Sequence, residues 1–158
     1  MLKYCLEKWD KNKNILEEKL RTTKGLNECR YKDLVKMVVD YILNYNTEYE
    51  LDVWSDDITE VDHGSYSGTL LYLIHKDEYA PYENDYLMTY VNYGSCSGCD
   101  TLKSIQSWDW DDDGLLNEGQ IKAFMTLCKD LVTNIVCPYN IGWRSSPIYE
   151  TVEVNDAG

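Results

Sequence analysis

Residues 86–107 read YLMTYVNYGSCSGCDTLKSIQS, and this stretch decides the fold. From Tyr86 to Tyr93 apolar and polar side chains alternate, which is typical of a β-strand with one buried face. The spacing then changes, and residues 99–107 have the pattern of a helix. Between them lies the turn Gly94-Ser95-Cys96-Ser97-Gly98-Cys99-Asp100. A strand that leads through a turn into a helix indicates a domain with both kinds of element.

The same two periodicities divide the rest of the chain. The predicted helices are 2–23, 31–45 and the segment from Asn117 to Cys137-Pro138, where proline ends the helix. The predicted strands are 58–61, 69–75 and 86–93, and residues 50–54 would add a fourth. Gly25 is expected to end the first helix.

These elements predict an α+β fold in a single domain over residues 1–158. We expect a helical hairpin over residues 1–46, followed by a three- to four-stranded antiparallel sheet. The long C-terminal helix should pack on that sheet, because its apolar side chains recur on one face.

The net charge of −13 is distributed unevenly. Residues 1–46 contain ten Lys and Arg against seven Asp and Glu, whereas residues 47–158 contain five against twenty-one. A field this negative repels nucleic acid and anionic membranes and attracts basic surfaces. We therefore expect a partner protein with a basic surface and no direct nucleic-acid or membrane binding; the alternative is that the charge serves solubility. The candidate binding residues are Asp56, Asp57, Asp109, Asp111, Asp112 and Asp113.

The first residues show no export signal. Met1 leads into a charged, helix-like stretch instead of the apolar core of a signal peptide, so we expect a cytoplasmic protein. The six cysteines are then expected to be reduced thiols. Neither a nucleophile elbow, a phosphate loop nor a zinc-protease motif is present, and we do not expect an enzyme.

Cys96 and Cys99 form a Cys-x-x-Cys pair at the start of a predicted helix. Such thiols ionise readily and can exchange with disulfides, although the neighbouring carboxylate of Asp100 should raise the thiol pKa. Asp100 or Ser97 is expected to cap the helix. Gly94 and Gly98 allow backbone angles that other residues avoid. Close packing, a redox or regulatory thiol pair and a metal-ligand pair remain as alternatives.

A zinc site at this turn would need two further ligands. The candidates are His63, His75, Cys29, Cys128 and Cys137, and none has the spacing of a second ligand pair. Cys5 and Cys128 lie on apolar faces of predicted helices, where we expect small hydrophobic side chains.

The segment from Asp109 to Gln120 resembles an EF-hand calcium loop. Its expected ligands are Asp109, Asp111, Asp113, the Leu115 carbonyl, Asn117 and Gln120, with Gly114 at the turn. Gln120 stands where a bidentate Glu is usual, so only weak calcium binding is expected. The alternative is an acidic linker in which Asp-Gly forms a turn and Asn117 caps the last helix.

Beyond these patterns the chain resembles a family of small phage and gut-bacterial proteins with a Gly-Ser-Cys-Ser-Gly-Cys-Asp-Thr-Leu signature. The run over residues 90–105 carries the resemblance, which extends to residues 58–71, 124–131 and 33–36. The resemblance implies a phage or prophage setting, and the family has no established activity.

Together, charge and resemblance predict a phage-encoded acidic binding protein that antagonises a host factor. One form would be an anti-CRISPR-type inhibitor whose carboxylates stand where nucleic-acid phosphates would lie. The alternatives are a thiol- or metal-dependent protein that uses Cys96 and Cys99, and a weakly calcium-binding accessory or immunity protein.

Overall fold

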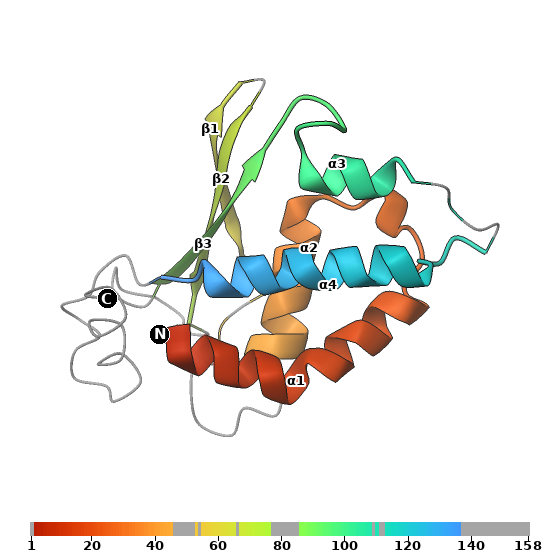
Figure 1. Ribbon diagram of the computed structural model, residues 1–158. Coiled ribbons are helices and arrows are strands. Elements are labelled where there is room, and N and C mark those ends of the chain that lie inside the picture. Colours follow the sequence, from red (N-terminus) through yellow and green to blue (C-terminus); the bar gives the residue numbers. More distant parts are fainter. Residues whose placement is uncertain are drawn as a thin grey trace.

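The computed structural model describes residues 2–45, 53, 55–65, 67–76, 86–108, 110 and 113–136. These residues form four α-helices and a three-stranded antiparallel sheet, which confirms the α+β prediction (Figure 1). The helices are α1 (Leu2–Thr22), α2 (Tyr31–Val38), α3 (Thr101–Gln106) and α4 (Glu118–Thr133). A 3₁₀ turn, η1 (Leu26–Glu28), precedes α2, and a π-helical turn, η2 (Val39–Leu43), follows it.

The sheet consists of β1 (Thr59–Gly64), β2 (Gly68–His75) and β3 (Tyr86–Tyr93) in the order β1-β2-β3. Tyr72 in β2 lies opposite Glu60 of β1 and Thr89 of β3, so these three side chains lie on the same face of the sheet. The predicted fourth strand is represented by Val53, which forms an isolated antiparallel bridge with Lys76. The other residues of 50–54 lie outside the described residues.

Two helix ends differ from the prediction. The segment predicted as one helix over 31–45 changes at Val39 into the π-helical turn, and buried Asn12 donates hydrogen bonds to the carbonyls of Ile42 and Tyr45 at 2.8 and 3.3 Å. The last helix ends at Thr133, before the predicted stop, because the chain there joins the sheet through a bridge between Met88 and Val136.

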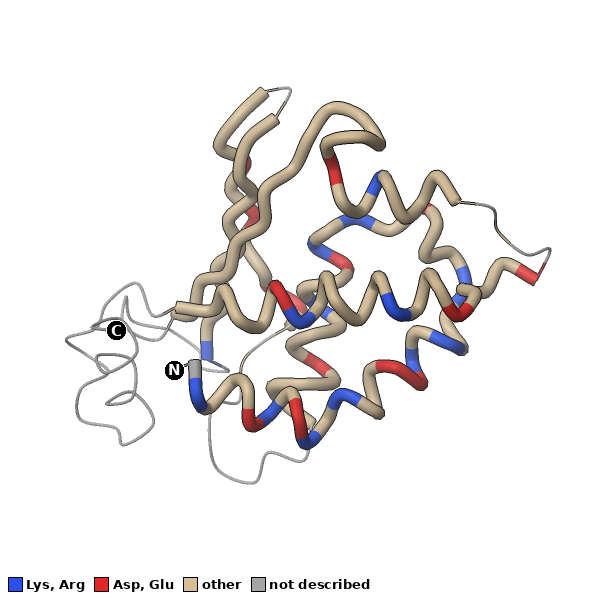
Figure 2. Tube along the Cα trace, in the orientation of Figure 1, with Lys and Arg blue, Asp and Glu red and all other residues tan. Residues whose placement is uncertain are grey.

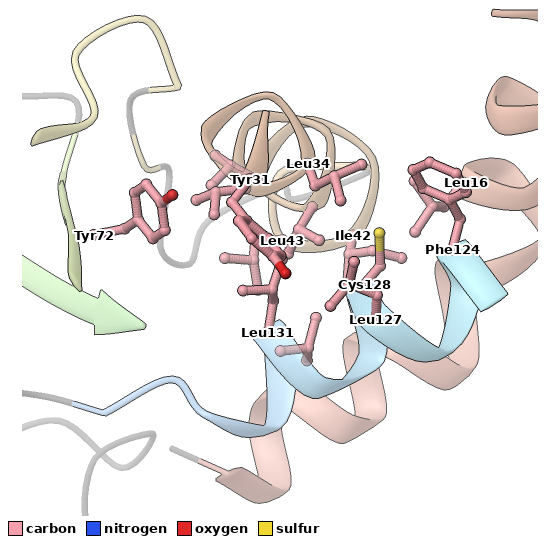
Figure 3. Close-up of a cluster of buried hydrophobic side chains, with 14 of the residues drawn as sticks. Leu16, Tyr31, Leu34, Ile42, Leu43, Tyr72, Phe124, Leu127, Cys128 and Leu131 are labelled. Atoms are coloured by element: carbon pink, nitrogen blue, oxygen red, sulfur yellow. The ribbon is translucent and has the colours of Figure 1, made fainter. Parts of the chain in front are cut away.

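Helix α4 is the centre of the packing, because it contacts α1, α2, α3 and β3. Figure 3 shows side chains from several of these elements pointing toward one another around α4. The fully buried side chains of this cluster include Leu16, Leu34, Ile42, Phe124 and Leu131. Complete burial of one such side chain contributes about 1.5–3 kcal/mol, so α4 joins the layers largely through apolar contact.

The charged residues of the described helices are mixed in sign. Figure 2 shows Lys and Arg interspersed with Asp and Glu along α1 and α4. At one end of the pair, Arg21 of α1 forms a two-bond ion pair with Glu118 of α4. None of the described helices is both long enough and apolar enough to cross a membrane.

Candidate functional site

The turn between β3 and α3 is held by the carboxylate of Asp100. Asp100 is buried and caps α3 by accepting a hydrogen bond from the Lys103 amide at 3.0 Å. It also accepts from the Gly94 amide at 3.0 Å, at the other end of the turn. Of the two predicted caps, Asp100 is therefore confirmed, and one side chain closes the turn across its whole length.

Tyr31, the first residue of α2, holds the Asp100 side chain in place. Its hydroxyl donates to Asp100 Oδ1 at 2.8 Å and accepts from the Leu102 amide at 3.0 Å. Burial raises the pKa of the Tyr31 hydroxyl, so it remains a neutral donor. The Lys103 ammonium adds a bond of 3.3 Å to the Gly94 carbonyl. The turn is thus attached to two helices and a strand.

Gly94 is required by close approach, since its backbone angle is ordinary. A Cβ atom at Gly94 would lie 2.5 Å from the Cys99 carbonyl oxygen and 2.6 Å from Cys99 Sγ. Neither Gly94 nor Gly98 uses the backbone freedom that glycine allows, because among the described glycines positive φ occurs at Gly25 and Gly114. Gly25, with φ of 84°, follows α1 as predicted.

The two thiols of the turn lie side by side at the surface. Cys96 Sγ and Cys99 Sγ are 2.9 Å apart, and both residues are exposed and unbridged. The amide of Cys96 donates to Cys99 Sγ at 3.3 Å. A disulfide bond is about 2.05 Å long, so a small movement of the side chains would join the two sulfurs.

The pKa of the Cys99 thiol is lowered. The main cause is the hydrogen bond from the Cys96 thiol, followed by the Cys96 amide and then the hydroxyl and amide of Ser95. These donors stabilise a thiolate. The prediction that Asp100 raises the thiol pKa is wrong, because its carboxylate is bonded to Gly94, Tyr31 and Lys103.

The other described cysteines have a different environment. Cys5 and Cys128 are fully buried, and Cys29 is partly buried. Burial raises the pKa of Cys29 and of Cys128 to about 12, so both stay protonated near neutral pH. Cys137 lies outside the described residues. Among the described cysteines, Cys96 and Cys99 are therefore the two whose thiols a disulfide substrate can reach.

The candidate zinc ligands do not come together with this pair. His63 is exposed on β1, whereas His75 is buried and contacts the Lys76 carbonyl and Asp57 at 2.7 and 3.2 Å. Among the described residues, no group of three or more His, Cys, Asp or Glu is arranged to hold a metal ion. The described surroundings therefore supply no complete zinc ligand set for Cys96 and Cys99.

The predicted calcium loop is only partly described, since Asp109, Asp111 and Asp112 lie outside the described residues. Gly114 has a φ of 73°, and Asp113 Oδ1 accepts from the Leu115 amide at 2.9 Å, as in an Asp-Gly turn. Asn117 and Gln120 exchange side-chain and amide hydrogen bonds of 2.9 Å, and Gln120 is completely buried. This pair forms a capping box at the start of α4. Calcium binding stays a prediction.

Two of the candidate acidic residues contact basic side chains of the same chain. Asp56 forms an ion pair with Lys36, and Asp57 contacts the imidazole of His75. Both carboxylates are largely exposed, so these contacts leave much of their surface open to a partner.

A pocket of about 500 Å³ adjoins Cys99 between α3 and α4. Its lining includes Ser104, Trp108 and Asp130, none of which the sequence marked as functional. Ser104 and Asp130 lie in predicted helices and Trp108 follows the predicted helix over 99–107, but the pocket depends on how α3 and α4 pack. Tyr31 was likewise missed, because it is 69 residues from Asp100.

Comparison with known proteins does not assign this site to a family. No protein-family model, curated protein or solved structure matches the chain.

Proposed function

We propose that this protein carries out thiol–disulfide exchange, with Cys99 as the attacking thiolate and Cys96 as the resolving thiol. The observation that supports this role is the 2.9 Å separation of two exposed sulfurs in an anchored turn. The lowered pKa of Cys99 favours it as the nucleophile, since the thiolate is the reactive form.

The exchange takes two steps. The Cys99 thiolate attacks one sulfur of a disulfide R–S–S–R, a Cys99–S–S–R bond forms, and RS⁻ leaves and takes a proton from water. Cys96 then loses its proton to water and attacks Cys99 Sγ, which releases the second RS⁻. The two protein thiols are oxidised by two electrons to one disulfide, and the substrate disulfide is reduced to two thiols.

The test is reaction of the reduced protein with 2-hydroxyethyl disulfide, followed by alkylation of the remaining thiols and measurement of intact mass. The wild-type protein should lose two alkylation sites without keeping an adduct. Cys96→Ser should accumulate a mixed disulfide on Cys99, and Cys99→Ser should react much more slowly. Cys29→Ser removes a partly buried thiol and should behave as the wild type.

Two results would overturn the proposal. One is that the wild-type pair stays fully alkylatable under conditions that oxidise free dithiols. The other is that Cys96→Ser traps no adduct at Cys99 although the folded protein is intact by circular dichroism.

A second candidate function is favoured by the charge. Residues 47–158 contain five Lys and Arg against twenty-one Asp and Glu, which supports an acidic protein that binds a basic surface. We propose, from the resemblance stated above, that it is phage- or prophage-encoded and antagonises a host factor in the cytoplasm, for example as an anti-CRISPR-type nucleic-acid mimic.

Capture of a basic host protein from lysate should weaken steeply as salt is raised, because screening removes charge attraction. Added DNA should release the same protein if the surface mimics nucleic acid. A captured protein that neither salt nor DNA releases would contradict this candidate. A Cys96→Ser, Cys99→Ser double variant separates the two functions, since charge-driven binding should persist without either thiol.

A further inference from the structure

The pocket beside Cys99 is built from two matching helical faces. On α3 and its continuation the lining residues are Thr101, Ser104, Ile105 and Trp108, and on α4 they are Ala123, Thr126, Leu127 and Asp130. Each set follows the spacing of one helix face, so the two helices form opposite walls. Ser97, Gly98 and Cys99 line the end that adjoins the turn, so the residue that carries the reactive sulfur borders the pocket. A volume of about 500 Å³ is within the range of roughly 300–1,000 Å³ for small-ligand pockets.

The floor of this pocket is apolar and its rim is polar. Ile105 and Leu127 are 2% and 3% exposed, so they form the floor and offer little surface. The indole of Trp108 is 43% exposed, and Thr126 and Asp130 are exposed on the α4 wall. A ligand in the pocket would therefore meet an indole, hydroxyl groups and a carboxylate.

The charge of the pocket is negative. The twelve lining residues, all within the described part of the chain, include no Lys or Arg and two carboxylates. Asp100 is buried and bonded to the turn, which leaves Asp130 as the lining carboxylate that faces solvent. A cation is attracted by such a carboxylate and by the face of an indole, whereas an anion finds no lining cation.

We infer that this pocket selects a cationic disulfide as the substrate of the thiol pair, namely a peptide disulfide whose cysteine is flanked by Lys or Arg. The inference rests on the proposed thiol–disulfide exchange. When a substrate sulfur reaches Cys99, the groups next to that sulfur lie beside the adjoining pocket, because Cys99 is one of its lining residues. A basic flanking side chain would then meet Asp130 or Trp108. A glutathione disulfide would bring carboxylates into a pocket lined by no Lys or Arg, since the Lys103 ammonium of the turn bonds the Gly94 carbonyl and does not line the pocket.

The first test compares rates of exchange with three small disulfides: cystamine, which is cationic, 2-hydroxyethyl disulfide, which is neutral, and glutathione disulfide, which is anionic. The wild type is compared with Asp130→Asn and with the control Asp10→Asn. Asp10 is an exposed carboxylate on α1 outside the pocket, so its loss changes the net charge equally. The rates of the variants are compared for one disulfide at a time. The leaving thiol is then the same in each comparison, so differences in its reactivity do not affect the result.

Asp130→Asn should lower the ratio of the cystamine rate to the neutral rate by about twofold to fivefold, as expected for loss of one partly solvated charge contact. Asp10→Asn should change that ratio much less, because Asp10 does not line the pocket and salt screens exposed charges that are not in contact. Trp108→Ala should slow exchange with a disulfide-linked peptide that has Lys beside its cysteine more than it slows exchange with 2-hydroxyethyl disulfide.

Equal effects of Asp130→Asn and Asp10→Asn on this ratio would overturn the inference, and so would a rise in the ratio for Asp130→Asn. In either case exchange with 2-hydroxyethyl disulfide would continue. Failure of the wild type to react with any of the three disulfides would instead overturn the underlying exchange function.

Discussion

At the scale of single residues, Gly94 is the point where strand and turn come closest. Its missing side chain allows the Cys99 carbonyl and sulfur to approach the end of β3. Gly98 lies in the same turn but has open surroundings, since the nearest atom to a Cβ there would be Cys96 Sγ at 3.8 Å. The two glycines therefore make a matched pair for mutation.

Gly94→Ala should lower the free energy of unfolding by about 1–3 kcal/mol, the usual cost of forcing atoms into filled space. Gly98→Ala should have a much smaller effect, because its Cβ would make ordinary contact. Urea denaturation followed by circular dichroism measures both. Equal stabilities of the two variants would show that the contact at Gly94 relaxes without cost.

The reactivity of Cys99 should extend to lower pH than that of an ordinary thiol. Because the pKa is lowered in the folded protein, the thiolate is populated at pH values where a free cysteine is protonated. The rate of alkylation by iodoacetamide, resolved by peptide mass spectrometry, should therefore fall off later on acidification than for a model peptide. Cys96→Ala should shift the profile upward in pH, since it removes the thiol whose hydrogen bond does most to lower the Cys99 pKa. An unchanged profile would contradict that cause.

Local rules predicted some residue roles and failed for others. The caps Asp100 and Asn117 follow from residue type and position before a helix, and both are confirmed. The effect of Asp100 on the thiol pKa was predicted wrongly, because adjacency in sequence does not reveal where a side chain points. Its carboxylate is taken up by Gly94, Lys103 and Tyr31.

At the scale of elements, the hydroxyl of Tyr31 joins α2 to the thiol turn. Tyr31→Phe would leave the Leu102 amide without this acceptor and remove a donor to Asp100. We expect a loss of about 1–3 kcal/mol in the free energy of unfolding, as for other buried groups left unpaired.

A double-mutant cycle of Tyr31→Phe with Asp100→Asn should give a coupling energy of about 0.5–3 kcal/mol by urea denaturation. Tyr93→Phe is the control, because the Tyr93 hydroxyl bonds Asp62 at an exposed position and its loss should cost less. Additive effects of the Tyr31 and Asp100 substitutions would contradict a direct link between α2 and the turn.

Element boundaries show where periodicity stops being informative. The apolar pattern over residues 31–45 continues through Val39, so it does not reveal the change to a π-helical turn. That change is accompanied by a distant side chain, Asn12, which bonds two carbonyls near the end of the segment. Likewise, the end of α4 at Thr133 coincides with pairing to β3, which no local signal specifies.

At the scale of the whole molecule, a buried hydrogen bond ties the sheet to the central helix. Thr89 in β3 donates to the Leu131 carbonyl of α4 at 2.6 Å, and Thr89 is 2% exposed. Thr89→Val keeps the shape of the side chain and should reduce the free energy of unfolding by about 1 kcal/mol. The same substitution at exposed Thr126, whose hydroxyl bonds within α4, should be nearly neutral. Equal losses at both positions by thermal or urea denaturation would argue against this tie.

The fold class was predictable because two hydrophobic periodicities separate helices from strands. The candidate site was predictable only in part: the Cys-x-x-Cys spacing is local, whereas its setting is not. Gln106 bonds the Leu26 and Cys29 carbonyls, which are 80 and 77 residues away in the sequence, and it thereby holds α3 against η1 and the residue that follows it. Contacts of this range, and the pocket that they shape, follow from tertiary packing.

The anchoring of the turn through Asp100 has a consequence for how oxidation would be sensed. The bonds from Gly94, Tyr31 and Lys103 to this carboxylate involve no sulfur atom, so joining the two thiols would break none of them directly. Oxidation would then convert two exposed thiols into a disulfide while Asp100 continues to hold the backbone of the turn. A partner protein that distinguishes the reduced from the oxidised form would then have to contact the two sulfur atoms themselves.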